Sequence, residues 1–136
     1  MVERDLSESA DVYTILVVED EIILRFVACE FLRQAGFVVV EAASADEALP
    51  YVRAHPEIDL VFSDVRMPGK LDGLGLVHQL ADEFPDLRFV VASGDAAPAS
   101  ESTIPFFRKP YDLDAVVASI YTLLNIASAK GAANDL

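Results

Sequence analysis

Short apolar stretches recur along the chain, and segments with helical periodicity separate them. The stretch Tyr13–Val18 is apolar on both faces, as expected of a strand that is covered on both sides. Similar stretches follow at "FVVVEA" (37–42), "IDLVFSD" (58–64), "LRFVVAS" (87–93) and, in shorter form, within "IPFFRKP" (104–110). The pattern therefore predicts five strands.

Amphipathic helices are predicted between these strands. In the first intervening segment, apolar residues recur at helical spacing before a stop at Gly36: Leu24, Val27, Ala28, Phe31, Leu32 and Ala35. The second helix opens with a capping box, Ser44 with Glu47 three residues later. A third is marked by Leu74, Val77, Ala81 and Phe84, and a last one follows a cap at Asp112. This alternation predicts an α/β fold, a doubly wound five-stranded parallel sheet with right-handed crossovers.

Composition and charge narrow the functional classes. The 136 residues suffice for one domain of common size, and we expect a polar leader (1–12), a domain (13–126) and a flexible tail (127–136). The formal charge of −13 argues against nucleic acid and anionic membranes as partners, because both require a basic face. A single cysteine, Cys29, and the lack of any apolar run of about 20 residues fit a cytoplasmic location.

Polar residues that can bind a metal or take part in a reaction follow the predicted strands. In parallel α/β sheets, the working site lies beyond the carboxyl ends of the strands. These ends carry acids, a hydroxyl and an ammonium: Glu19, Asp20 and Glu21 after the first strand, then Asp64, Ser93 and Lys109. The sequence therefore predicts that these groups converge at one edge of the sheet.

Such a convergence suits phosphoryl chemistry with a divalent metal. Crowded carboxylates raise each other's pKa unless a cation holds them. Hard oxygen ligands, with positions left for water, suit Mg²⁺, which favours phosphate oxygens as further partners. Lys109 can neutralise an arriving phosphoryl group, and Ser93 can donate a hydrogen bond to it. Asp64 is then the candidate nucleophile, because carboxylates form aspartyl phosphates in this chemistry.

The chain resembles the receiver domain of two-component response regulators, over roughly 13–126. The matching features are Glu19-Asp20 after the first strand, Asp64 followed by "VRMPG", Ser93 after the fourth strand and the "KP" that begins at Lys109. The resemblance implies a flavodoxin-like fold. It also implies that Asp64 accepts a phosphoryl group from a histidine kinase or a histidine phosphotransfer protein, as part of signal transduction or a phosphorelay.

The resemblance also implies roles for individual residues. Mg²⁺ is implied to bind at four of them: Asp20 and Asp64 directly, Glu19 through water, and Arg66 through its backbone carbonyl. A cis Lys109–Pro110 bond is implied, as is a switch in which Ser93 and Phe106 respond to phosphorylation. A receiver of this kind catalyses its own phosphorylation and dephosphorylation, and it is not a conventional turnover enzyme.

The chain departs from the family pattern between Ser93 and Lys109. This stretch is shorter than usual, and "GDAAPASESTIP" lacks helical periodicity. We therefore expect a shortened or missing fourth helix, and a monomer or weak dimer. Since no output domain follows the last predicted helix, we expect a stand-alone receiver whose output is a protein contact or a further phosphotransfer.

A docking surface is predicted on the first helix. Ile22, Ile23, Phe26 and Cys29 lie off its predicted inward stripe, although all four are apolar. An apolar patch beside the acids suits docking of a phosphotransfer helix bundle. The alternative is that the last helix or the leader partly covers these residues.

Three other functions compete with this interpretation. A degenerate receiver would bind a partner without phosphorylation, although the complete set of acids, hydroxyl and lysine argues against it. A hydrolase that uses an aspartyl phosphate would need a second aspartate two residues after Asp64, where this chain has Arg66. A flavodoxin-like cofactor binder would suffer repulsion between its phosphate and three acids after the first strand.

Overall fold

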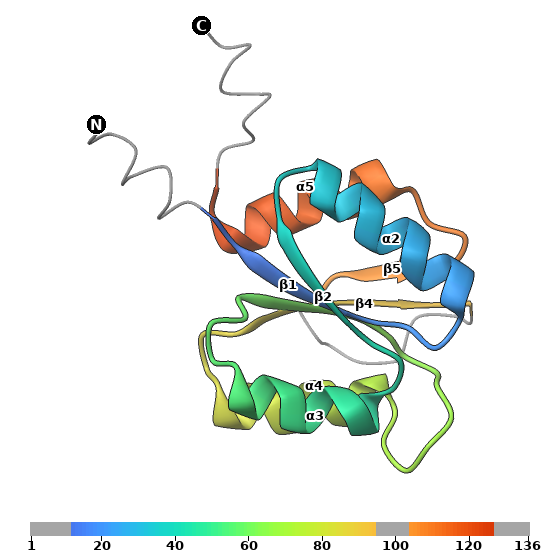
Figure 1. Cartoon of the computed structure of the whole chain (residues 1–136), viewed down its shortest axis with the longest axis vertical. Coiled ribbons are helices and arrows are strands. Elements are labelled where there is room, and N and C mark those ends of the chain that lie inside the picture. Colours follow the sequence, from blue (N-terminus) through green and yellow to red (C-terminus); the bar gives the residue numbers. More distant parts are fainter. Residues whose placement is uncertain (1–11, 95–103, 127–136) are drawn as a thin grey trace, which may run out of the picture.

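The computed structural model describes residues 12–94 and 104–126 (Figure 1). The elements in chain order are β1 (Thr14–Val18), α2 (Ile22–Gln34), β2 (Val38–Ala42), α3 (Ala45–Ala54), β3 (Leu60–Asp64), α4 (Gly73–Glu83), β4 (Arg88–Ser93), β5 (Phe106–Arg108) and α5 (Leu113–Leu124). Strands and helices therefore alternate from β1 to β4 and again from β5 to α5, as the apolar pattern predicts.

The strands form one parallel sheet in the order β2-β1-β3-β4-β5. Helices α2 and α5 cover one face, and α3 and α4 cover the other (Figure 1). This is the strand order of flavodoxin-like folds, in which the chain changes direction across the sheet between β1 and β3. The predicted α/β fold, a doubly wound five-stranded parallel sheet, is confirmed.

The central strands are buried because their side chains alternate between two apolar cores. In β1, Ile15 and Val17 face the core under α2 and α5, whereas Leu16 and Val18 face the core under α3 and α4. None of these four side chains is more than 2% exposed. Burial on both faces explains why the sequence of β1 shows no polar alternation.

Capping side chains begin three of the helices. Ser44 accepts a hydrogen bond from the backbone N–H of Glu47 at the start of α3, as the predicted capping box requires. Asp72 caps α4 and Asp112 caps α5 in the same manner. Gly36 follows α2 with a φ of 105°, a conformation that favours glycine.

The predicted inward stripe of α2 is wrong at two positions. Val27 is 46% exposed, whereas Cys29 is fully buried together with Ala28 and Leu32. The buried face is therefore rotated from the predicted one, because both faces of this helix carry apolar residues and periodicity alone does not choose between them. Cys29 accordingly leaves the predicted docking patch, while Ile22, Ile23 and Phe26 remain exposed.

Several predictions concern residues outside the described ranges. The shortened or missing helix was predicted for the segment between β4 and β5, of which residues 95–103 are not described. The leader (1–11) and the tail (127–136) are outside the described ranges as well. Within the described ranges, none of the helices has the length and apolar character needed to cross a membrane.

Candidate functional site

Three carboxylates converge where β1 and β3 end. The two strands are paired, with Val18 opposite Ser63, so the residues that follow them are neighbours. Carboxylate oxygens of Glu19, Asp20 and Asp64 all lie within 4.8 Å of one another. Glu19 and Asp64 are buried, at 4% and 6% exposure, and Asp20 is half-buried. The predicted clustering at this edge of the sheet is therefore present for three of the four acids. Glu21 is exposed and does not belong to the group.

Lys109 reaches this cluster from the end of β5. Its Nζ lies 3.0 Å from Oε1 of Glu19 and 3.2 Å from Oδ2 of Asp64. Its backbone N–H donates to the carbonyl of Ser93 over 2.8 Å, which ties the ends of β4 and β5 together. The Lys109–Pro110 bond is cis, as the resemblance implies.

Burial and charge shift the pKa values of these groups. Burial raises the pKa of Glu19. Hydrogen bonds from the Glu21 N–H and from Lys109 lower it, but the effect of burial is larger. Burial likewise raises the pKa of Asp64; the Lys109 charge opposes this, and the charge of Asp20 adds to it. Burial alone would lower the pKa of Lys109, but its bond to Glu19 and the charges of both acids raise it. Lys109 therefore stays protonated and partly compensates the two buried acids.

The donor set suits a divalent cation. One ammonium faces three carboxylates, so the cluster keeps an excess of negative charge when all of these groups are ionised. Carboxylate oxygens grouped this closely are the hard ligands that Mg²⁺ prefers. The residues present therefore fit a magnesium ion.

The other predicted site residues lie around this cluster. Ser93 is buried at the end of β4, one residue beyond Ala92, which pairs with Asp64. The side chain of Arg66 is exposed, and its backbone N–H donates to the Asp64 carboxylate. Phe106 begins β5, half-buried against the core under α3 and α4. Their positions are thus known, and their roles stay predictions.

Tyr111 lies at the rim of the site. Its ring packs edge-on against Phe62, with ring centroids 5.6 Å apart. Burial raises its pKa to about 12, and the charge of Glu19 adds to this. The phenol is therefore neutral at ordinary pH, as suits a ring that packs against Phe62.

Two residues that the sequence analysis did not single out contact the site. The Arg25 guanidinium donates to the backbone carbonyl of Glu19 over 2.7 Å. Gly73, the first residue of α4, lies so close to Asp64 that a Cβ there would overlap the Asp64 carbonyl oxygen. The sequence offered one signal for Arg25, since a basic residue that closely follows three acids can reach back to the turn that they form. Nothing in the sequence showed that Gly73 approaches another segment closely.

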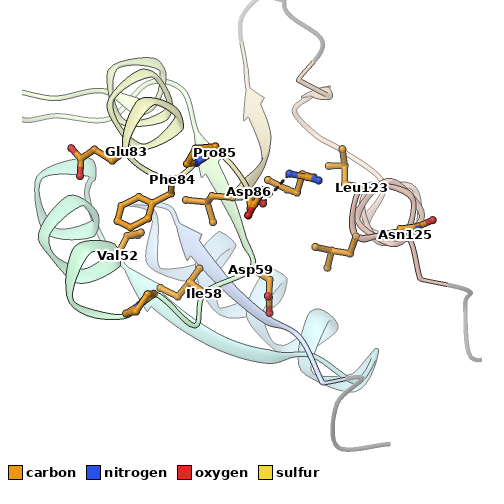
Figure 2. A pocket seen from close by; sticks show the side chains of 13 residues that line it. Val52, Ile58, Asp59, Glu83, Phe84, Pro85, Asp86, Leu123 and Asn125 are labelled. Atoms are coloured by element: carbon orange, nitrogen blue, oxygen red, sulfur yellow. Dashed lines mark hydrogen bonds between the residues drawn. The ribbon is translucent and has the colours of Figure 1, made fainter. Parts of the chain in front are cut away.

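A pocket of about 410 Å³ lies at the opposite edge of the sheet and contains none of the predicted site residues. Figure 2 shows its lining at the amino ends of β3 and β4, between the ends of α3, α4 and α5. Ile58, Phe84 and Leu123 supply apolar surface, and Asp59 adds a carboxylate that accepts from the Thr14 N–H. This pocket and the acidic cluster are therefore separate features of the described part of the chain.

Comparison with known proteins agrees with the fold and the site. The response regulator receiver domain family matches residues 15–120. The sensor kinase CckA of Brucella abortus is 37% identical over 127 residues, which are 88% of this chain and 13% of that protein. The structure of the receiver domain from the hybrid histidine kinase CckA has a TM-score of 0.71 at 35% identity. It covers 82% of this chain and 98% of that one.

A more distant structure shares the fold. The response regulator protein TrrA of Thermotoga maritima, solved in complex with Mg²⁺-BeF, has a TM-score of 0.74 at 24% identity. The match covers 82% of this chain and 98% of that one. The chain spans between 13% and 47% of the length of the first curated relatives that it matches.

Fold, site and family match define a receiver domain of two-component signalling. The chain belongs to the response regulator receiver domain family.

Proposed function

We propose that this chain accepts a phosphoryl group on Asp64, in a reaction that depends on Mg²⁺. The observation that carries the proposal is the placement of Asp64. It shares a cluster with Glu19 and Asp20, and Lys109 lies 3.2 Å from its carboxylate. A nucleophile beside a metal-binding cluster and a fixed cation is suited to attack on phosphorus, because both compensate the charge of the phosphoryl oxygens.

The donor is a phosphohistidine of a histidine kinase or of a histidine phosphotransfer protein. A carboxylate oxygen of Asp64 forms the new bond to phosphorus as the phosphorus–nitrogen bond breaks, and the electron pair stays on the imidazole nitrogen. Lys109 pairs with a phosphoryl oxygen in place of one of its present carboxylate partners, and Ser93 donates a hydrogen bond to another. The transfer moves one group once and is not turnover of a substrate.

Magnesium would be held by Asp20 and Asp64, with Glu19 acting through water and Arg66 through its carbonyl. When bound, the ion supplies positive charge to the phosphoryl oxygens. The TrrA structure supports Mg²⁺ as the cation, because a protein of the same fold was solved with Mg²⁺-BeF.

A first test combines a small phosphodonor with intact mass measurement. Wild-type protein with Mg²⁺ and acetyl phosphate should gain one phosphate in mass, and Asp64→Asn should gain none, because the amide is not a nucleophile for phosphorus. Asp20→Asn also removes one acid of the cluster but keeps the nucleophile. It should gain much less phosphate than wild type, and a higher Mg²⁺ concentration should restore the gain, whereas Asp64→Asn should stay unmodified at any Mg²⁺ concentration. A wild-type protein that stays unmodified with several donors would contradict the proposal and favour a receiver that binds its partner without phosphorylation.

The exposed apolar patch on α2 supports a helical protein as the phosphodonor. Ile22, Ile23 and Phe26 are 69%, 72% and 61% exposed, and they directly follow the acids of the site. A contiguous apolar surface in this position suits docking of a helix that presents the phosphohistidine to Asp64.

The variant Phe26→Ser separates docking from chemistry. We expect it to slow phosphorylation by a histidine phosphotransfer protein by about tenfold, since removing one buried aromatic contact costs on the order of 1–2 kcal/mol at an interface. Phosphorylation by acetyl phosphate should be unchanged, because that donor needs no docking surface. Val38→Ser, at another exposed apolar residue (47%), is the matched control. Equal rates for Phe26→Ser and wild type with the protein donor would exclude this surface.

A further inference from the structure

Arg25 links the backbone of the acidic turn to a neighbouring strand. It lies in the first turns of α2, and its side chain is 18% exposed. Its Nη1 donates to the backbone carbonyl of Glu19 over 2.7 Å, and its Nε pairs with Oε1 of Glu41 in β2 over 3.1 Å. One guanidinium therefore connects two segments that are far apart in sequence, and one of its contacts lies directly at the candidate metal site.

The carbonyl that Arg25 holds belongs to the peptide between Glu19 and Asp20. The N–H of Glu19 is already fixed, since it donates to the carbonyl of Ala42 over 3.1 Å. Its carboxylate is fixed as well, by the N–H of Glu21 and by Lys109. The carbonyl bond to Arg25 restrains the orientation of the Glu19–Asp20 peptide, and this orientation influences the direction in which the Asp20 side chain leaves the backbone.

We infer that Arg25 is a positioning residue for the candidate metal site. It orients the Glu19–Asp20 peptide so that the Asp20 carboxylate points at Asp64, and Glu41 holds the guanidinium in place. The inference rests on the proposed function, because it concerns the same Mg²⁺-binding cluster. A charge-assisted hydrogen bond of 2.7 Å is strong enough to fix a peptide plane in a turn.

Charge and position make opposite predictions for this residue. Arg25 is a cation beside a site for a cation, so its charge alone weakens Mg²⁺ binding. If charge dominated, removal of the guanidinium would tighten binding. If position dominates, removal weakens binding because the Asp20 carboxylate is no longer held toward Asp64. The sign of the change therefore distinguishes the two roles.

The experiment compares Arg25→Met with Arg33→Met by calorimetric titration with MgCl₂. Arg33 is the matched control, because it lies on the same helix and also reaches Glu41, at 3.4 Å. Its other bonds go to Glu30 and to the carbonyl of Val39, away from the acidic turn. We expect Arg25→Met to raise the Kd for Mg²⁺ about tenfold, as is typical when a group that orients a metal ligand is lost. Arg33→Met should leave the Kd unchanged.

A third variant and a stability measurement complete the test. Arg25→Lys keeps the charge and one donor within reach of the Glu19 carbonyl, so it should recover most of the affinity. Urea unfolding without Mg²⁺ should show comparable midpoints for Arg25→Met and Arg33→Met, because each variant loses one bond to a backbone carbonyl together with its ion pairs. Arg25→Met loses the pair with Glu41, and Arg33→Met loses the pairs with Glu30 and Glu41.

Three results would overturn the inference. They are an unchanged or lower Kd in Arg25→Met, an equal loss of affinity in Arg33→Met, or a lysine variant as weak as the methionine one. A wild-type protein that binds no Mg²⁺ would instead contradict the proposed function, so the two failures are distinguishable.

Discussion

Replacing Gly73 by alanine should lower the free energy of unfolding by at least about 3 kcal/mol, at the upper end of the cost of overpacking. The new Cβ would overlap the carbonyl oxygen of Asp64 and lie 2.9 Å from both the Asp64 carbonyl carbon and the Cα of Val65. All three are backbone atoms of the end of β3 and the residue after it, so no side-chain rotation relieves the contact. Either α4 moves away from the sheet or the backbone of Asp64 shifts.

The neighbouring glycine provides a matched control. A Cβ on Gly75 would meet mainly a methyl group of Leu71, at 2.7 Å, which a side-chain rotation can move. Gly75→Ala also gains helix propensity of about 0.5–1 kcal/mol, so it should be close to neutral. Urea unfolding of both variants measures the difference. Similar midpoints would show that the contact between α4 and Asp64 is softer than the structure indicates.

Replacing Lys109 by methionine should have the second large effect. At pH 7 we expect a loss of about 3 kcal/mol of stability without Mg²⁺, since removal of one partner leaves the buried charges of Glu19 and Asp64 uncompensated. The rate of phosphorylation by acetyl phosphate should fall at least about a hundredfold, as is typical when a fixed group that stabilises transition-state charge is lost. Lys70→Met, at an exposed loop lysine, is the surface control and should match wild type.

The loss in Lys109→Met should depend on pH in a defined direction. Burial raises the pKa of Glu19 and of Asp64, and removal of the lysine removes the main opposing influence on Asp64 and one of those on Glu19. Some acids have a higher pKa in the folded protein than in the unfolded chain. Such an acid contributes its full stabilisation at pH values below its unfolded pKa, and this contribution is lost as the pH rises through its folded pKa. The variant should therefore regain stability relative to wild type as the pH falls from 7 to about 5.

A double variant tests the cause. Glu19→Gln removes one buried charge, so adding it to Lys109→Met should restore part of the lost stability at pH 7. Urea unfolding of the single and double variants at both pH values gives the comparison. A double variant that is less stable than Lys109→Met would show that the lysine stabilises the fold through packing and not through these two charges.

The sequence alone determined the fold class and the cluster of acids. β1 from Ile15 to Val18 and β3 from Leu60 to Phe62 are continuous apolar runs because both of their faces are buried, and such runs can be read without coordinates. Parallel strands all present their carboxyl ends at one edge, so Glu19, Asp20, Asp64 and Lys109 were expected at the same edge once the strands were identified, and the structure brings them into contact there. The apolar pattern and the rule for parallel sheets were therefore enough to predict the strands and the edge at which these residues lie.

Only the tertiary structure decided which side of α2 is buried and what holds the acidic turn. Val27 and Cys29 are both apolar, and packing against the sheet chose Cys29. The bond from Arg25 to the Glu19 carbonyl and the approach of Gly73 to Asp64 involve backbone atoms. Every residue carries the same backbone, so the sequence does not mark which of its atoms will be contacted. These contacts depend on how helices and strands are placed relative to one another, and packing determines that placement.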